Sequence, residues 1–151
     1  MVGALRRNHH LGCFRLPESR SEASEPKLKN IAVVSLGGII GSLSRWGLSL
    51  PFSEKGFPWG TLLVNYIGSV VLVAVLLYSR HHKSAKWWWR PALGAGFCGG
   101  FTTYSAFALK MDQYFERSSI TEAIVYAVAS LLGTFILVFS THELLERKLV
   151  K

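Results

Sequence analysis

The stretch GFCGGFTTYSAF, residues 96–107, lies within a long uncharged segment, yet it contains three glycines and four hydroxyl side chains. Glycine disfavours a helix, and a hydroxyl without a partner costs free energy in lipid. Gly99 and Gly100 therefore predict a break in a membrane-spanning helix. Nonhelical backbone at membrane depth persists only where its polar groups meet protein, water or an ion. A break exposes carbonyls that can coordinate a cation, and it leaves a helix N-terminus that favours an anion.

Four segments of the chain, one of which holds this stretch, contain almost no charged residues. A helix needs roughly 20 apolar residues to cross the hydrocarbon core. The four segments are residues 31–50, 59–78, 91–109 and 120–141, with only Arg45 and Glu122 charged. A soluble four-helix bundle would need polar helix faces, which these segments lack. The sequence predicts an all-α membrane protein with four transmembrane helices, of which the third is broken.

The rest of the chain is polar and divides into a tail and short connections. Residues 1–29 have the composition of a disordered tail, and residues 30–151 are expected to form one transmembrane domain. Pro51 is expected to end the first span, and Pro58 and Pro91 to lie in the first turns of the second and third. The polar stretch KMDQYFERSS, residues 110–119, is expected to connect the third span to the fourth.

The net charge is +8, and the basic residues lie mainly on one predicted side. With four spans, the N-terminus, the middle connection and the C-terminus share a side. They hold 13 of the 17 Lys and Arg residues. This asymmetry predicts that both termini are cytoplasmic, in a multi-pass protein of the cell membrane. The sequence KWWWR, residues 86–90, combines tryptophan with cations as a nucleic-acid site would, but its place beside a span indicates a membrane interface instead.

Polar residues inside the spans are candidates for function. Arg45 either reaches the nearby interface or attracts anions at the mouth of a vestibule. The amide of Asn65 either serves an anion or bonds neighbouring helices. Ser130 and Thr134 are four residues apart, so their hydroxyls share one helix face. That spacing would also suit close helix packing.

Glycines also recur at a spacing that suits close helix packing. Gly37 and Gly41, and likewise Gly96 and Gly100, form G-x-x-x-G motifs.

Beyond the expected break, two aromatic residues, Tyr104 and Phe107, are three apart and share a face. The edge of an aromatic ring carries partial positive charge and can face a small anion. Packing in the core or against lipid is the alternative.

These motifs together resemble those of the CrcB/Fluc fluoride channels. GGFTTYSAF resembles the family signature around G-G-h-T/S-T-F-S-T-F. The stretches GGIIGSLSRW and GTLLVNYIGS in the first two spans, and S-x-x-x-T in the fourth, occur in the same order. The resemblance covers residues 30 to 145, nearly everything beyond the tail.

The resemblance implies an antiparallel, dual-topology-type dimer of four-helix subunits with two fluoride pores. Sodium would bind at the centre of the dimer interface, through the main-chain carbonyls of Gly99 and Thr102. The fluoride pathway would be formed by Asn65, Tyr104, Phe107, Ser130 and Thr134, with Arg45 at the vestibule.

The implied function is passive, selective export of cytoplasmic fluoride, which needs no covalent chemistry and therefore no enzyme. At three positions the chain differs from the family: Tyr104 replaces phenylalanine, Ala108 replaces serine and Lys110 replaces an acidic residue.

Three other interpretations of the sequence differ in what they require. Because the 13 basic residues on one side favour a single orientation, the chain is a candidate partner subunit, itself non-conducting or partly conducting, that pairs with an oppositely oriented paralogue. A proton-coupled exporter like the small multidrug transporters would need a carboxylate in the first span, where there is none. An integral-membrane enzyme lacks a converging set of His, Asp and Glu within the spans.

Overall fold

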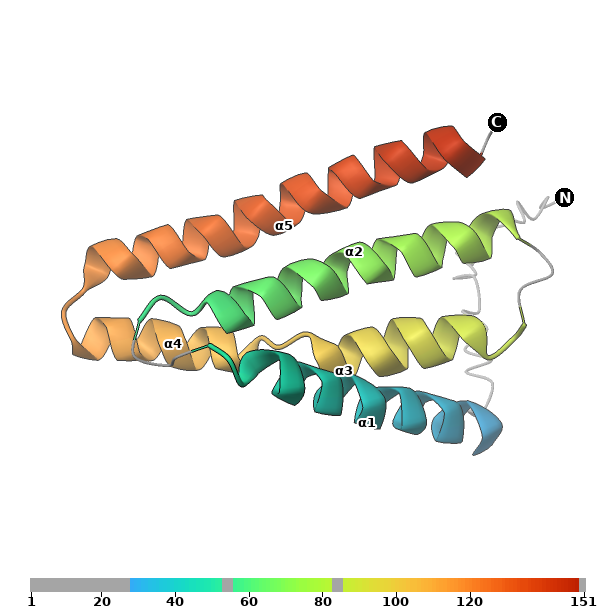
Figure 1. Ribbon diagram of the computed structural model, residues 1–151, viewed down its shortest axis with the longest axis horizontal. Coiled ribbons are helices and arrows are strands. Elements are labelled where there is room, and N and C mark those ends of the chain that lie inside the picture. Colours follow the sequence, from blue (N-terminus) through green and yellow to red (C-terminus); the bar gives the residue numbers. More distant parts are fainter. Residues whose placement is uncertain (1–27, 53–55, 83–85, 150–151) are drawn as a thin grey trace, which may run out of the picture.

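A computed structural model of the protein describes residues 28–52, 56–82 and 86–149, and all regular structure in them is helical. The helices are α1 (Leu28–Ser49), α2 (Trp59–His81), η1 (Arg90–Cys98), α3 (Gly99–Phe101), α4 (Ser105–Glu116) and α5 (Ile120–Leu149). η1, α3 and α4 follow one another along a single passage that is interrupted at residues 102–104. The chain therefore runs four times along the bundle (Figure 1), as the sequence predicts.

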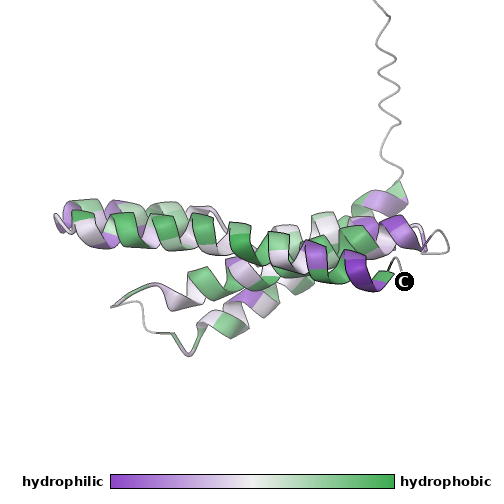
Figure 2. Cartoon of the chain, turned by 90° about the horizontal axis from the view of Figure 1, so that it is seen from above, coloured by the Kyte–Doolittle hydropathy of each residue, from purple (hydrophilic) through white to green (hydrophobic). Residues whose placement is uncertain are grey.

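Three helices in the described part of the chain, α1, α2 and α5, are long and apolar enough to cross a membrane. The third passage is interrupted, so neither of its two halves reaches that length. Apolar residues extend along the helices, and hydrophilic residues gather at the end where α5 terminates (Figure 2). α1 begins and α5 ends at this same end of the bundle (Figure 1), as four passages require.

The break in the third passage lies further along the chain than the glycines predict. Gly99 has helical backbone angles, φ −64° and ψ −37°, and α3 continues to Phe101. The chain leaves the helix at Thr102, whose ψ is 158°. The prediction of a broken helix is confirmed, but the placement of the break at Gly99 and Gly100 is wrong. Gly100 serves close packing instead, because a Cβ there would lie within 3.0 Å of the Gly38 carbonyl.

Two further boundaries differ from the sequence predictions. Residues 110–116 belong to α4 rather than to a connection, because Lys110 and Tyr114, one turn apart, are both buried against the bundle. Pro58 lies just before α2, as its N-cap, whereas Pro91 lies in the first turn of η1 as expected. The predicted tail, residues 1–29, lies outside the described residues except for its last two, which begin α1.

α1 packs against η1 and α3 through glycines, which we call the glycine seam: Gly37, Gly41, Gly96 and Gly100. A Cβ added at any of them would come within 3.0 Å of a backbone oxygen of the opposite helix. The two backbones therefore touch without intervening side chains, as small residues at four-residue spacing permit. The tight helix contacts expected from the G-x-x-x-G motifs are confirmed within one chain.

α2, α4 and α5 pack differently, through a cluster of large side chains. Leu62, Tyr114, Ala123 and Tyr126 form its buried centre. Further along, the Tyr66 hydroxyl donates a hydrogen bond to the carbonyl of Ala129 on α5. These contacts hold α2 and α5 together on one flank, while the glycine seam holds α1 on the other.

Candidate functional site

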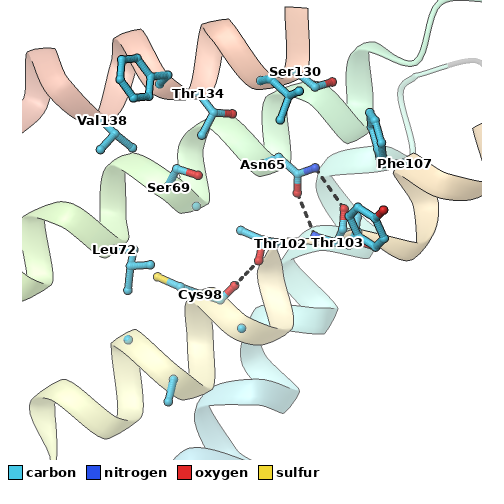
Figure 3. Close-up of a pocket in the computed structure, with 17 residues that line it drawn as sticks. Asn65, Ser69, Leu72, Cys98, Thr102, Thr103, Phe107, Ser130, Thr134 and Val138 are labelled. Atoms are coloured by element: carbon cyan, nitrogen blue, oxygen red, sulfur yellow. Dashed lines mark hydrogen bonds between the residues drawn. The ribbon is translucent and has the colours of Figure 1, made fainter. Parts of the chain in front are cut away.

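A groove of about 620 Å³ runs between α2, the third passage and α5, beside the break (Figure 3). Its residues come from all three elements, so that side chains distant in sequence face one space. All of the predicted site residues except Arg45 line it. The lining residues are Asn65, Gly68, Ser69, Leu72, Gly94, Ala95, Cys98, Gly99, Thr102, Thr103, Tyr104, Phe107, Ser130, Leu131, Thr134, Phe135 and Val138.

Asn65 bonds the break directly to α2. Its Nδ2 donates to the Thr103 carbonyl at 3.0 Å, and its Oδ1 accepts from the Thr103 N–H at 2.8 Å (Figure 3). A backbone N–H can only donate, so this pair of bonds fixes the orientation of the amide. The side chain replaces helical partners that Thr103 has lost, and the second proton on Nδ2 remains as a donor. Of the two roles expected for Asn65, the structure shows the bond between helices.

The second half of the passage, α4, begins at the groove. The hydroxyl of Thr103 accepts a hydrogen bond from the N–H of Ala106 at 3.2 Å, as a capping side chain does. It also lies 3.1 Å from the Ser105 hydroxyl. The start of α4 thus presents hydroxyls and a positive helix end toward the space that Asn65 lines.

Arg45 reaches the break from the other flank of the bundle. Its Nη1 donates to the Thr102 carbonyl at 3.2 Å, and Ser42, on the same face of α1, donates to the Gly100 carbonyl at 3.4 Å. The guanidinium therefore lies behind the break rather than in the groove. Together, α1 and α2 supply donors to three carbonyls that the interrupted helix leaves open, those of Gly100, Thr102 and Thr103.

Phe107 links the groove to the packed cluster beyond it. Its ring centroid lies 5.8 Å from that of Tyr104 and 5.1 Å from that of Tyr126. Tyr104 is 79% exposed, so most of its ring is open to the surroundings of this single chain. The predicted aromatic pair is thus in contact beside the break.

α5 contributes the remaining hydroxyls. Ser130 and Thr134 both line the groove, one turn apart (Figure 3). Sequence reasoning missed Tyr126, which is fully buried and lies one turn before Ser130. Its hydroxyl lies beside those of Ser130 and Thr61, but it makes no hydrogen bond of normal geometry within the described residues. The four-residue spacing of Tyr126, Ser130 and Thr134 was the available signal.

The described lining of the groove is mostly apolar, and the polar side chains within it are uncharged. It contains an amide, several hydroxyls and three aromatic rings, but no Asp, Glu, Lys, Arg or His. Neutral donors can replace water around a small anion without holding it as strongly as a fixed cation would.

The main-chain carbonyls at the break suit a small cation in part. The Thr103 N–H bonds to Asn65, so the Gly99 carbonyl has lost the donor that a continuous helix would supply. Thr102 uses one lone pair of its carbonyl oxygen for Arg45 and keeps the second. Both carbonyls can therefore accept a cation, although the Arg45 guanidinium beside Thr102 would repel it.

Comparisons with known proteins find relatives that agree with one another. Residues 32–142 match the family described as "CrcB-like protein, Camphor Resistance (CrcB)". The chain is 40% identical over 104 residues to a "Fluoride-specific ion channel FluC" of Bordetella avium, which covers 69% of this chain and 82% of the relative. It is 37% identical over 114 residues to a protein of the same name from Agrobacterium fabrum, covering 74% of this chain and 91% of the relative. Each match spans most of the relative's length.

Proposed function

Because the chain belongs to the CrcB family of multi-pass membrane proteins, we propose that it is a fluoride-specific ion channel that lets fluoride leave the cell passively. The observation that carries this proposal is the groove, which brings an amide, hydroxyls and aromatic rings together beside a helix break. Fluoride is trapped in neutral cytoplasm when hydrogen fluoride enters and dissociates. The membrane potential then drives the anion out through a selective pore, so no enzymatic step is involved.

In this proposal each groove residue has a role in replacing water around fluoride. The remaining proton on Nδ2 of Asn65 and the hydroxyls of Ser130 and Thr134 donate hydrogen bonds. The ring edges of Tyr104 and Phe107 supply partial positive charge. Arg45 acts from behind the break, where its charge favours an anion in the vestibule. Larger halides are rejected because the donors converge on a small ion.

We also propose that the chain acts as an antiparallel dimer. The groove wall on α5 carries Leu131 and Phe135, which are 70% and 60% exposed. A second subunit would cover these side chains and close the groove into a pore. Sodium at the centre of that interface would be held by the carbonyls of Gly99 and Thr102, and it would tie the two breaks together.

Growth on fluoride tests the function. Cells that lack their own fluoride exporter should regain growth on fluoride when they express this chain. The Asn65→Asp variant, which places a negative charge in the path, should not rescue them at the same membrane abundance. Equal growth with and without the chain, at verified membrane abundance, would contradict export of fluoride by this chain alone.

A second candidate function, as the partner subunit of a heterodimeric channel, is favoured by the distribution of charge. The proposed cytoplasmic side holds 13 of 17 basic residues, which favours one orientation of the chain. An antiparallel homodimer needs both orientations. Reporter fusions at the C-terminus decide the matter: signal on the cytoplasmic side only supports a fixed orientation, and equal signal on both sides supports the homodimer.

A further inference from the structure

Tyr66 on α2 crosses the space between α2 and α5 beside the groove. Its hydroxyl donates a hydrogen bond to the carbonyl of Ala129 on α5. The ring is half-buried and packs against the buried cluster between α2, α4 and α5. Tyr66 is not among the described residues that line the groove. Any influence that it has on the groove therefore passes through the residues beside it.

Gly133 provides the place on α5 where Tyr66 fits. A Cβ at Gly133 would overlap the Tyr66 hydroxyl and would lie 3.1 Å from Cε1 of its ring. A helical side chain covers the turn before its own Cα, so a side chain at position 133 would stand over the carbonyl of Ala129. Glycine inside a helix is unfavourable relative to alanine, and the seating of Tyr66 gives a physical reason for it here.

This contact lies directly beside three residues that line the groove. On α2, Tyr66 follows Asn65 in the sequence. On α5, each small residue that meets Tyr66 precedes a hydroxyl of the groove, Ser130 or Thr134. Successive residues of an α-helix point about 100° apart, so the Tyr66 contact fixes the rotation of α5 as well as its separation from α2. That rotation turns Ser130 and Thr134 toward the groove (Figure 3).

We propose that Tyr66 is a positioning residue for the groove: seated on Gly133, its ring sets the separation of α5 from α2 and with it the width of the fluoride path. This inference rests on the proposed function, because it takes the groove to be that path. A narrow path rejects larger halides only while its walls keep their distance, and a fitted site must be held to within about 0.5 Å. A spacer acts in both directions: added bulk widens the path, and lost bulk narrows it.

Fluoride and chloride efflux from liposomes tests both directions. Gly133→Ala adds a methyl group between Tyr66 and α5. It should raise the ratio of chloride to fluoride efflux about tenfold, the lower end of what one carbon atom changes in the discrimination of a fitted site. Tyr66→Leu shortens the spacer and should lower fluoride efflux about tenfold while chloride stays inside. The double variant should move both rates back toward those of the unaltered chain, because the added methyl group faces a shorter side chain.

Gly37→Ala is the matched control for added bulk. Its Cβ would overlap the Ala92 carbonyl in the glycine seam, away from the groove. It should lower the unfolding temperature and leave the ratio of chloride to fluoride efflux unchanged in the protein that folds. A ratio in Gly133→Ala equal to that in Gly37→Ala would overturn the proposal. So would the same change in rates for Gly133→Ala and Tyr66→Leu, which is the result expected if the contact only stabilises the fold.

Crystal structures of the full chain and its variants test the positioning without reference to transport. α5 should lie farther from α2 in Gly133→Ala, with Tyr66 still between them, and closer to α2 in Tyr66→Leu. An α5 that keeps its place in either variant would overturn the proposal. An unaltered chain that releases neither ion would contradict the proposed function and leave the crystal structures to decide the role of Tyr66.

Discussion

The two flanks of the bundle differ in how closely their helices approach. Along the glycine seam, α1 meets η1 and α3 backbone to backbone, with no room for one added carbon atom. Between α2 and α5, the helices are separated by large side chains and enclose a groove of about 620 Å³. Two adjacent residues show the contrast: a Cβ on Gly100 would collide with α1, whereas a Cβ on Gly99 would meet no atom within 4 Å. One flank thus packs two backbones directly against each other, and the other leaves a space beside the break into which an amide and several hydroxyls face.

The largest effect is expected from filling the seam. Gly100→Ala places a methyl group against the Gly38 carbonyl, and overpacking of this kind costs about 1–3 kcal/mol or more. Gly41→Ala meets the Phe97 carbonyl in the same way. We expect both variants to lower the yield of monodisperse protein in detergent and its unfolding temperature.

Gly99→Ala and Gly47→Ala are the matched controls, because neither added Cβ would meet an atom within 4 Å. Both should retain the unfolding temperature, since alanine also has the better helix propensity. An equal loss of stability in Gly99→Ala and Gly100→Ala would contradict the distinction between the two flanks.

The next largest effect is expected from removing the two hydrogen bonds that join Asn65 on α2 to Thr103 at the break. Asn65→Ala leaves the N–H and carbonyl of Thr103 without their side-chain partners, at a cost below about 1–3 kcal/mol for each group, because both are only part-buried. Asn65→Asp keeps an acceptor for the N–H but places negative charge in the groove. We expect both variants to abolish fluoride efflux, with a higher unfolding temperature for Asn65→Asp. Efflux at the original rate in either variant would show that the groove is not the path.

A smaller effect is expected from removing one hydroxyl from the groove. Thr134→Val keeps the shape of the side chain and removes a donor worth about 0.5–1.5 kcal/mol, or up to about tenfold in rate. Thr141→Val changes the same helix outside the groove lining and should alter the efflux rate less than about twofold. Equal slowing of efflux by the two variants would show that the Thr134 hydroxyl contributes no more to the path than a hydroxyl outside the groove.

The smallest effect is expected at Tyr104, where the family resemblance implies phenylalanine. The side chain is 79% exposed, so Tyr104→Phe removes a hydroxyl from the open part of the groove. Fluoride efflux should change by less than about twofold, because an exposed hydroxyl can bond to water instead. An increase well beyond that range would show that the hydroxyl obstructs the path.

The packed flank was predictable from sequence, because glycines at four-residue spacing act locally on one helix face. The hydroxyls of Ser130 and Thr134 were predictable for the same reason. The sequence predicted the break three residues too early. Its true position depends on Asn65, which lies 38 residues before Thr103. No local pattern encodes a bond over that separation.

Two other features could not be read from local composition. The polar start of KMDQYFERSS indicated a connection, yet α4 continues through Glu116 because Lys110 and Tyr114 are buried by other helices. Tyr126 shares the four-residue spacing of Ser130 and Thr134, but an aromatic residue in an apolar span is equally typical of core packing, and its hydroxyl is seen beside Ser130 and Thr61 only in the folded chain. Tertiary contacts decide both cases.

The most direct test of the central claim is ion efflux from liposomes that contain the full chain, with fluoride and chloride measured side by side. A path of converging neutral donors predicts rapid loss of fluoride while chloride is retained. Loss of both ions at the same rate would contradict the selective path. Retention of both by well-folded protein, with and without an oppositely oriented partner subunit, would contradict the assignment of a channel.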